Sequence, residues 1–364
     1  MVQLSKRYGA IVAWCLLLVS ILFKPAFAQG VPNHALAQHR KLFLFIQGVD
    51  TSLSANDARN GIISAQETFG ISHGLYPFLK ATYPQASFLM FSYNGDNGKG
   101  IPVAYKCQDT VADKAIGYLP SNTLTTYAIR LHTQLQHYLE GKPATDVYLV
   151  SHSLGGVIPF SYLAYLKSLN ALDASIAGTS SRVKGVITLD ATIGGTASGL
   201  AYTEAAFVTF AQAGYPCTFL QKHHIFPSTA KLVSDIFQQD RSPIGGTNSV
   251  MGVAFGRSIT NQQLAEEAAR NGIQVLTVGN VRDFLFEPAV CHSSYENFLS
   301  SQWLADRGNT SGVYGRTFAS GDATCSSFSH LDQNHELSVT DGRVHQAVEQ
   351  LVDRRPVTEL NPYP

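Results

Sequence analysis

The chain has 364 residues, of which 45% are hydrophobic and 14% are charged, so it can bury a large core in one large domain or two modest ones. Its 26 basic and 26 acidic residues give a formal net charge of +0 at pH 7. The sequence has no run of basic residues interleaved with aromatic residues, which is the pattern typical of a nucleic-acid-binding protein.

The first 28 residues have the pattern of an export signal. Lys6 and Arg7 precede an apolar run, 11–23, and Ala26-Phe27-Ala28 offers small residues at both positions that a signal peptidase requires. The run is shorter than the roughly 18–20 residues that span a bilayer, which disfavours a permanent anchor. We therefore expect cleavage after Ala28 and a mature protein that is secreted or periplasmic.

Four cysteines remain after that cleavage. An even number of cysteines in an exported protein predicts two disulfide bonds, and the sequence leaves all three possible pairings open. The four residues are Cys107, Cys217, Cys291 and Cys325.

The first part of the mature chain alternates apolar strands with helical patterns. Strands are predicted at 41–46 and 86–93, and helices at 53–82 and 121–140. Residues 94–120 are rich in Gly and Asp and have no clear period, which is typical of a long loop. Alternation of this kind predicts a mostly parallel sheet covered by helices on both faces.

The stretch around Ser153 has the pattern of a sharp turn between a buried strand and a helix. The apolar run 147–150 is followed by Ser151-His152-Ser153-Leu154-Gly155-Gly156, and a helix is predicted over 154–169. A serine at the tip of such a turn is a candidate nucleophile. Ser151 stands where the G-x-S-x-G pattern has its first glycine, and it is also small.

The end of the first strand offers a second part of the same site. Gln47-Gly48-Val49 directly follows that strand, and a glycine there lets the backbone approach closely. The amide of Val49 can then point at a developing oxyanion, although an ordinary turn would have the same composition.

Beyond a strand at 185–190 comes a long insertion, 191–272. Amphipathic segments at 203–213 and 228–239 are candidates for a helical cap, and a further helix is predicted at 262–270.

The last part of the chain carries the remaining acidic and basic candidates. A strand at 273–279 is followed by Asp283 and then by an irregular insertion that extends to about Asp332. His335 precedes a last helix whose apolar face carries Val344 and Leu351.

These motifs resemble those of α/β-hydrolases of the lipase and esterase kind, over roughly residues 41–355. The resemblance rests on Ser151 to Gly156, on Gly48-Val49, on Val281-Arg282-Asp283 and on His335. The order Ser, Asp, His along the chain is also the order of that family. The resemblance implies an α/β-hydrolase fold, with a mostly parallel central sheet, helices on both faces and a helical cap insertion. Core residues would lie at 29–190 and 273–364, with the cap at 191–272.

The resemblance further implies a catalytic triad of Ser153, His335 and Asp283, with the amides of Val49 and Leu154 as the oxyanion hole. Two alternatives stay open. Asp190 also ends a strand, as the acid does in some lipases, and His330 lies five residues before His335.

Other histidines receive structural roles. His152 is expected to be a buried structural residue, because neighbouring side chains on a strand point to opposite faces. His345 is expected to face solvent from the last helix. The adjacent pair His223-His224 lacks the spacing of a strong metal site, so neither a metal nor a cofactor is predicted.

The sequence thus predicts a secreted serine ester hydrolase that cleaves acyl esters through an acyl-enzyme. Its partners would be a small-molecule or lipid ester and, transiently, a lipid interface, with no nucleic acid involved. An acyltransferase or peptidase on the same fold, or a non-catalytic binding protein on this scaffold, are the alternatives, since fold does not determine function. The natural ester and the oligomeric state are not specified.

Overall fold

A computed structural model describes ten segments of the chain: 40–48, 68–70, 72–93, 95–103, 124–142, 144–169, 182–191, 261–283, 311–321 and 328–360. The side chains of 68, 154 and 328–333 are not included in that description. The predicted signal segment, both cap segments, the His223-His224 pair and all four cysteines of the mature chain lie outside the described residues. Within the described segments, no helix is both long enough and apolar enough to span a membrane.

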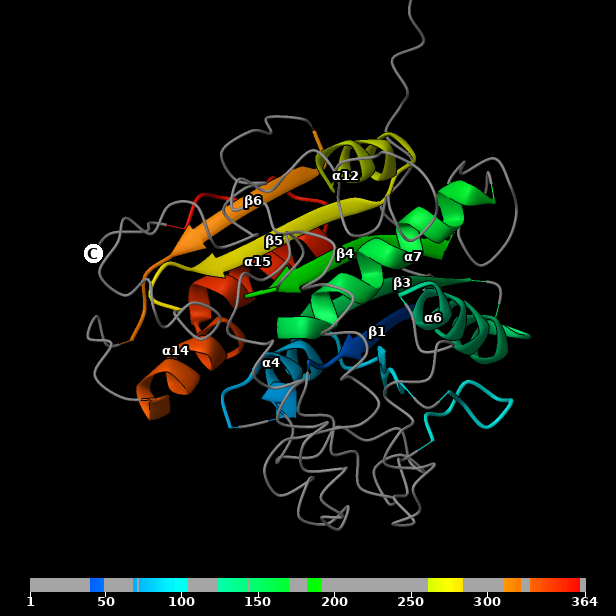
Figure 1. The fold of residues 1–364 in the computed structure, drawn as a ribbon, viewed down its shortest axis with the longest axis horizontal. Helices are drawn as coiled ribbons and strands as arrows, with labels where there is room; N and C mark the ends of the chain where they lie inside the picture. Colours follow the sequence, from blue (N-terminus) through cyan, green and yellow to red (C-terminus); the bar gives the residue numbers. More distant parts are fainter. Residues whose placement is uncertain are drawn as a thin grey trace, which may run out of the picture. The chain divides into compact units, whose positions relative to one another are not determined.

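A six-stranded sheet forms the centre of the unit that spans Arg40–Pro364 (Figure 1). Its strands lie in the order β2-β1-β3-β4-β5-β6, and every neighbouring pair is parallel. The six strands are β1 (Arg40–Ile46), β2 (Ser87–Met90), β3 (Thr145–His152), β4 (Val183–Leu189), β5 (Gln274–Asn280) and β6 (Val313–Phe318). Because all strands run in one direction, their carboxyl ends meet at one edge of the sheet.

Strand β1 shows why the sheet is buried on both faces. Leu42, Leu44 and Ile46 belong to one hydrophobic cluster, and Phe43 and Phe45 belong to the other. Alternate side chains of a strand point to opposite faces, so a continuous apolar run requires cover on both sides.

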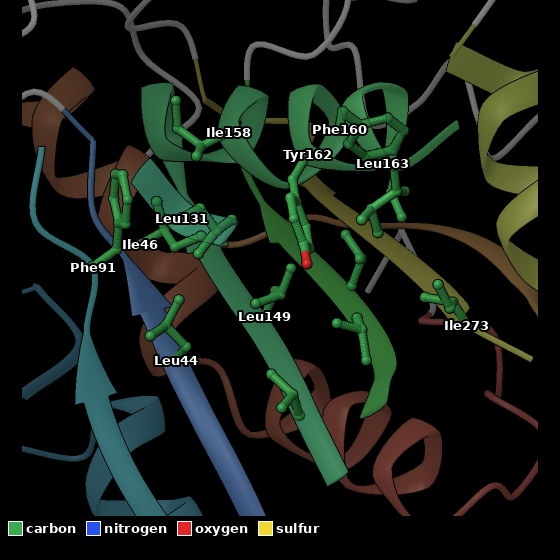
Figure 2. Packing of buried hydrophobic residues seen from close by; sticks show 14 of the residues in the cluster. Leu44, Ile46, Phe91, Leu131, Leu149, Ile158, Phe160, Tyr162, Leu163 and Ile273 are labelled. Carbon is green, nitrogen blue, oxygen red and sulfur yellow. The ribbon is translucent and has the colours of Figure 1, made fainter. Parts of the chain in front are cut away.

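Helices supply that cover. Helices α6 (Leu124–Leu139), α7 (Val157–Ser168) and α12 (Asn261–Arg270) contribute to the cluster that contains Leu44. Figure 2 shows Ile158 and Leu163 of α7 lying over Leu44 of β1 and Leu149 of β3.

The other face is covered by α4 (Leu75–Thr82), α14 (Phe328–Thr340) and α15 (Gly342–Val352), which contribute to the cluster that contains Phe43. A short 3-10 turn, η1 (Thr68–Gly70), adds Phe69 to this cluster. The predicted α/β architecture, with a parallel sheet and helices on both faces, is confirmed for these segments.

Two elements near the carboxyl terminus differ from the prediction. Strand β6 lies inside the segment that was expected to be an irregular insertion, and it pairs with β5 at the edge of the sheet. His330 and His335 both lie within α14, whereas both were expected in loops before the last helix. Helix α14 ends at Thr340, and Asp341 caps the next helix by accepting a hydrogen bond from the Arg343 amide at 2.8 Å.

The expectation that His345 faces solvent is wrong. Its ring stacks on Phe78 of α4 with centroids 4.8 Å apart, and its Nε2 lies 2.8 Å from the carbonyl oxygen of Val339. Burial between the two helices lowers the pKa of His345 from its usual value, because it disfavours the charged ring. Contact between α4 and α15 therefore includes a polar side chain that the apolar pattern of α15 does not reveal.

Candidate active site

The turn that carries Ser153 has a strained backbone. Strand β3 ends at His152, a 3-10 turn, η3 (Ser153–Gly156), follows, and α7 begins at Val157. Ser153 has φ +57°, a left-handed conformation that is uncommon for a residue with a side chain. Such strain persists only where the surroundings enforce it, and it is concentrated at functional sites.

The surroundings of the turn explain why small residues flank Ser153. A Cβ atom on Gly155 would lie 2.4 Å from the carbonyl oxygen of Ile46 and 2.5 Å from that of Gln47. A Cβ atom on Gly156 would lie 2.1 Å from the Cβ of Ala191. The turn therefore packs tightly against the ends of β1 and β4, and only glycine fits at positions 155 and 156.

Ser151 departs from the glycine of the common pattern for a local reason. It lies in β3, fully buried, and its hydroxyl donates a hydrogen bond of 2.9 Å to the carbonyl oxygen of Ile187 in β4. Its side chain is thus small enough for the turn and satisfies its own polar group.

The carboxyl ends of three adjacent strands bring polar side chains together. Ser153 follows β3, Asp190 follows β4 and Asp283 lies three residues beyond the end of β5. All three residues are buried, at 7%, 1% and 5% relative exposure. Parallel strands in neighbouring positions make this the expected edge for a site.

Helix α14 brings His335 to the same edge. Its Nδ1 lies 2.5 Å from Oδ2 of Asp283, and neither side chain is more than 5% exposed. A carboxylate can only accept, so Nδ1 carries the proton, and in the neutral ring Nε2 is the basic nitrogen. The structure therefore joins the predicted acid to the predicted base, which are 52 residues apart in the chain.

His335 and Asp283 are held in place by two asparagines that the sequence analysis did not identify. The Nδ2 group of Asn280 donates to the carbonyl oxygens of Asn334 and Ser320, at 2.9 and 3.1 Å. Asn334 in turn donates to the carbonyl oxygen of Arg282 at 2.8 Å. Arg282 and Asn334, which directly precede Asp283 and His335, are thus joined by a hydrogen bond. Asn280 is recognisable in the sequence only as a polar residue at the end of an apolar strand.

The structure supports a structural role for His152. Its Nε2 lies 2.9 Å from the carbonyl oxygen of His335, and the two rings have centroids 4.6 Å apart. A carbonyl only accepts, so Nε2 of His152 is the donor. The residue before Ser153 therefore contacts the residue that pairs with Asp283, which links the turn after β3 to α14.

His152 should also make the protein sensitive to acid. Burial, then the nearby His335, lowers the pKa of His152 to about 3 from 6.5. The unfolded chain binds this proton below pH 6.5, whereas the folded chain binds it only near pH 3. We expect stability to fall as the pH drops through this window, by up to about 1.4 kcal/mol per pH unit from this group.

His152→Asn removes that titration, so its unfolding free energy should change less steeply between pH 6.5 and pH 3 than that of the wild type. Urea denaturation at a series of pH values measures both slopes. His73→Asn is the matched control, because His73 is exposed and asparagine tolerates its φ of +66°. Parallel pH curves for His152→Asn and the wild type would contradict the assignment.

Asp190 is not bonded to His335 in the way that Asp283 is. Its Oδ1 accepts a hydrogen bond of 2.6 Å from the amide of Asn280. Burial, then the charge of Asp283, raises the pKa of Asp190 to about 8. Of the two acidic candidates, Asp283 makes the direct contact with the predicted base, and Asp190 lies beside the pair, where its protonated form is favoured.

The predicted oxyanion donors are described only in part. Val49 lies outside the described residues, and of Leu154 only the backbone, within η3, is described. Gln47, two residues before Val49, is buried, and its carbonyl oxygen accepts a hydrogen bond of 2.6 Å from the hydroxyl of Tyr93. Burial raises the pKa of Tyr93, which keeps this hydroxyl protonated and the end of β1 anchored beside Gly155.

One group of side chains has the composition of a metal site. Ligand atoms of His152, Asp190 and His335 lie within 4.8 Å of one another. Both imidazoles already use one ring nitrogen in a hydrogen bond inside the protein, and a cation on the other nitrogen of His335 would occupy the basic atom of the ring. The group therefore fits proton chemistry better than a resident metal.

The chain matches no family model and no curated protein sequence. Among solved structures, it resembles a phospholipase from Legionella pneumophila described in complex with thio-NAD, with 15% identity and a TM-score of 0.34. That alignment covers 66% of this chain but only 37% of the phospholipase, so this chain spans well under half of its length.

Two further similar structures are covered over most of their length. A naproxen esterase from Bacillus subtilis has 14% identity and a TM-score of 0.40, with 86% of this chain and 84% of the esterase aligned. A 2-hydroxy-6-oxo-6-phenylhexa-2,4-dienoate hydrolase from a Rhodococcus species has 8% identity and a TM-score of 0.43, with 86% and 91% aligned. Likenesses at this level assign no activity.

The parallel sheet, the strained serine turn after β3 and the order Ser, Asp, His themselves identify an α/β-hydrolase fold.

Proposed function

We propose that this protein is a serine hydrolase that cleaves carboxylic esters through an acyl-enzyme, with Ser153 as nucleophile, His335 as general base and acid, and Asp283 as the acid that orients His335. The observation that carries the proposal is the buried hydrogen bond between Asp283 and His335 beside the serine turn. His152, the residue before Ser153, touches the His335 ring, so the pair lies next to the strained serine.

The chemistry follows from these roles. A serine hydroxyl is a weak nucleophile at neutral pH, so Nε2 of His335 takes its proton as Oγ of Ser153 attacks the ester carbonyl carbon. The Asp283 carboxylate accepts a hydrogen bond from Nδ1 and stabilises the imidazolium that forms. The negative oxygen of the tetrahedral intermediate would accept hydrogen bonds from the amides of Leu154 and Val49.

The intermediate then breaks the bond to the leaving alcohol, which takes the proton from His335. The acyl group remains on Ser153. A water molecule gives a proton to His335 and attacks the acyl carbon, and the second tetrahedral intermediate releases the carboxylic acid and restores the serine hydroxyl. No step requires a metal or an organic cofactor.

The direct test is covalent labelling. A fluorophosphonate probe should modify the purified protein stoichiometrically, and peptide mass spectrometry should place the adduct on Ser153, because the probe mimics the attacked acyl centre. p-Nitrophenyl esters of increasing acyl length would then define the preferred substrate. Acid-denatured protein is the control for non-specific labelling. A folded protein that neither labels nor hydrolyses any of these esters would refute the proposal and favour a non-catalytic scaffold.

A further inference from the structure

Asp190 has features that a turn residue does not need. It follows β4 with φ +43°, an uncommon conformation for a non-glycine residue, and its side chain is 1% exposed. Its Oδ1 accepts the Asn280 amide, and the hydroxyl of Ser338 in α14 is a second hydrogen-bond donor to the carboxyl group. A fully buried carboxyl group beside the acid and the base of the candidate site calls for a functional explanation.

The position of Asp190 supplies one. A carboxylate oxygen of Asp190 lies within 4.8 Å of a ring nitrogen of His335 and of His152. Asp283 is close enough for its charge to act on Asp190, and it bonds the same His335 ring. Two carboxyls, from the ends of adjacent strands β4 and β5, therefore flank a single imidazole.

We propose that Asp190 is a second acidic residue of the site: a positioning residue whose buried carboxyl group lies beside the His335 ring and becomes the carboxylate partner of the His335 imidazolium when Asp283 is absent. This inference rests on the proposed function of Ser153 and His335, and it adds a role that the triad itself does not include.

The electrostatics agree with this arrangement. Three titratable groups face Asp190: Asp283 after β5, His335 of α14 and His152 of β3. Burial and the Asp283 charge favour the protonated form of Asp190, whereas a positive His335, the Asn280 amide and the Ser338 hydroxyl favour the ionised form. When the Asp283 charge is removed, burial is the one remaining effect that favours protonated Asp190. We therefore expect Asp190 to ionise at a lower pH in that variant than in the wild type.

The test is a double-mutant cycle of Asp283→Asn, Asp190→Asn and the double variant, assayed for ester hydrolysis from pH 5 to pH 9.5. Loss of the only acid of a serine triad typically lowers kcat by about 10⁴-fold. We expect Asp283→Asn to retain at least about tenfold more activity than the double variant, with a rate that rises with pH as Asp190 ionises. Asp146→Asn, at the opposite end of β3, is the matched control and should keep the wild-type profile.

A second readout does not depend on activity. In NMR titrations, the His335 ring resonances of the wild type should show an inflection near pH 8 from the ionisation of Asp190, and Asp190→Asn should lack it. If Asp283→Asn is no more active than the double variant at any pH, or if Asp190→Asn leaves the His335 titration unchanged, the inference is overturned. A wild-type protein that is inert toward fluorophosphonate would instead overturn the proposed function, and the NMR comparison would still decide whether Asp190 ionises beside His335.

Discussion

Replacing Ser153 with alanine is expected to lower kcat for ester hydrolysis by about 10⁴- to 10⁶-fold, because alanine retains the shape of the turn but has no nucleophile. Alanine has the same Cβ atom as serine, so the strain at φ +57° is unchanged. The melting temperature should therefore stay close to that of the wild type. Steady-state assays with a p-nitrophenyl ester, together with thermal unfolding, measure both quantities.

The control for Ser153→Ala is the same substitution at Ser168. That serine lies in the last turn of α7, where its hydroxyl donates to the carbonyl oxygen of Tyr165 at 2.7 Å. Ser168→Ala should keep full activity. A Ser153→Ala protein with activity within tenfold of the wild type would mean that another group attacks the ester, and the proposed mechanism would have to be abandoned.

Replacing Gly155 with alanine is expected to disrupt the site through packing rather than chemistry. The added Cβ atom would lie 2.4 and 2.5 Å from the carbonyl oxygens of Ile46 and Gln47, which are backbone atoms of the sheet edge and cannot move cheaply. We expect a loss of about 3 kcal/mol or more in the free energy of unfolding, at or beyond the upper end of typical overpacking. Displacement of β1 or of the serine turn should also lower activity at least about 100-fold, since small misplacements are costly in catalysis.

Gly342→Ala provides the matched comparison for Gly155→Ala. A Cβ atom at Gly342 meets nothing within 4 Å, and the residue begins α15, where alanine is a better helix former. Urea denaturation should show this variant to be as stable as the wild type. Equal stability of Gly155→Ala and Gly342→Ala would show that the turn after β3 is less tightly enclosed than its distances indicate.

The parts of the fold that could be predicted are those with strong local signals. The apolar run before Ser153 and the glycines after it specify strand, turn and helix within a dozen residues, and the structure has these elements there. Strand β6 has a weaker apolar pattern in the sequence, because it is a partly buried edge strand that contains Gly315 and Arg316. Helix α14 was missed since its sequence, FSHLDQNHELSVT, has no continuous apolar stripe.

In the candidate site, too, some residues could be predicted from local sequence patterns and others could not. The resemblance to α/β-hydrolases, with the positions of the two residues after a strand and before a helix, nominated Asp283 and His335 while leaving Asp190 and His330 open, and the structure joins the first two by a hydrogen bond. The tethers between Asn280 and Asn334, and the burial of Asp190, depend on contacts between segments that lie 54 or more residues apart. Local patterns contain no information about such contacts, so these roles became visible only in three dimensions.

The strained serine has a consequence for how this protein can evolve. A non-glycine residue in a rare backbone conformation costs about 1–3 kcal/mol, and glycine at position 153 would remove that cost together with the hydroxyl. With Ser153 as the proposed nucleophile, we expect selection for thermostability and selection for turnover to act in opposite directions on this residue. Stabilising substitutions in this protein should accumulate away from the turn, where they can offset the cost of the strained conformation at Ser153.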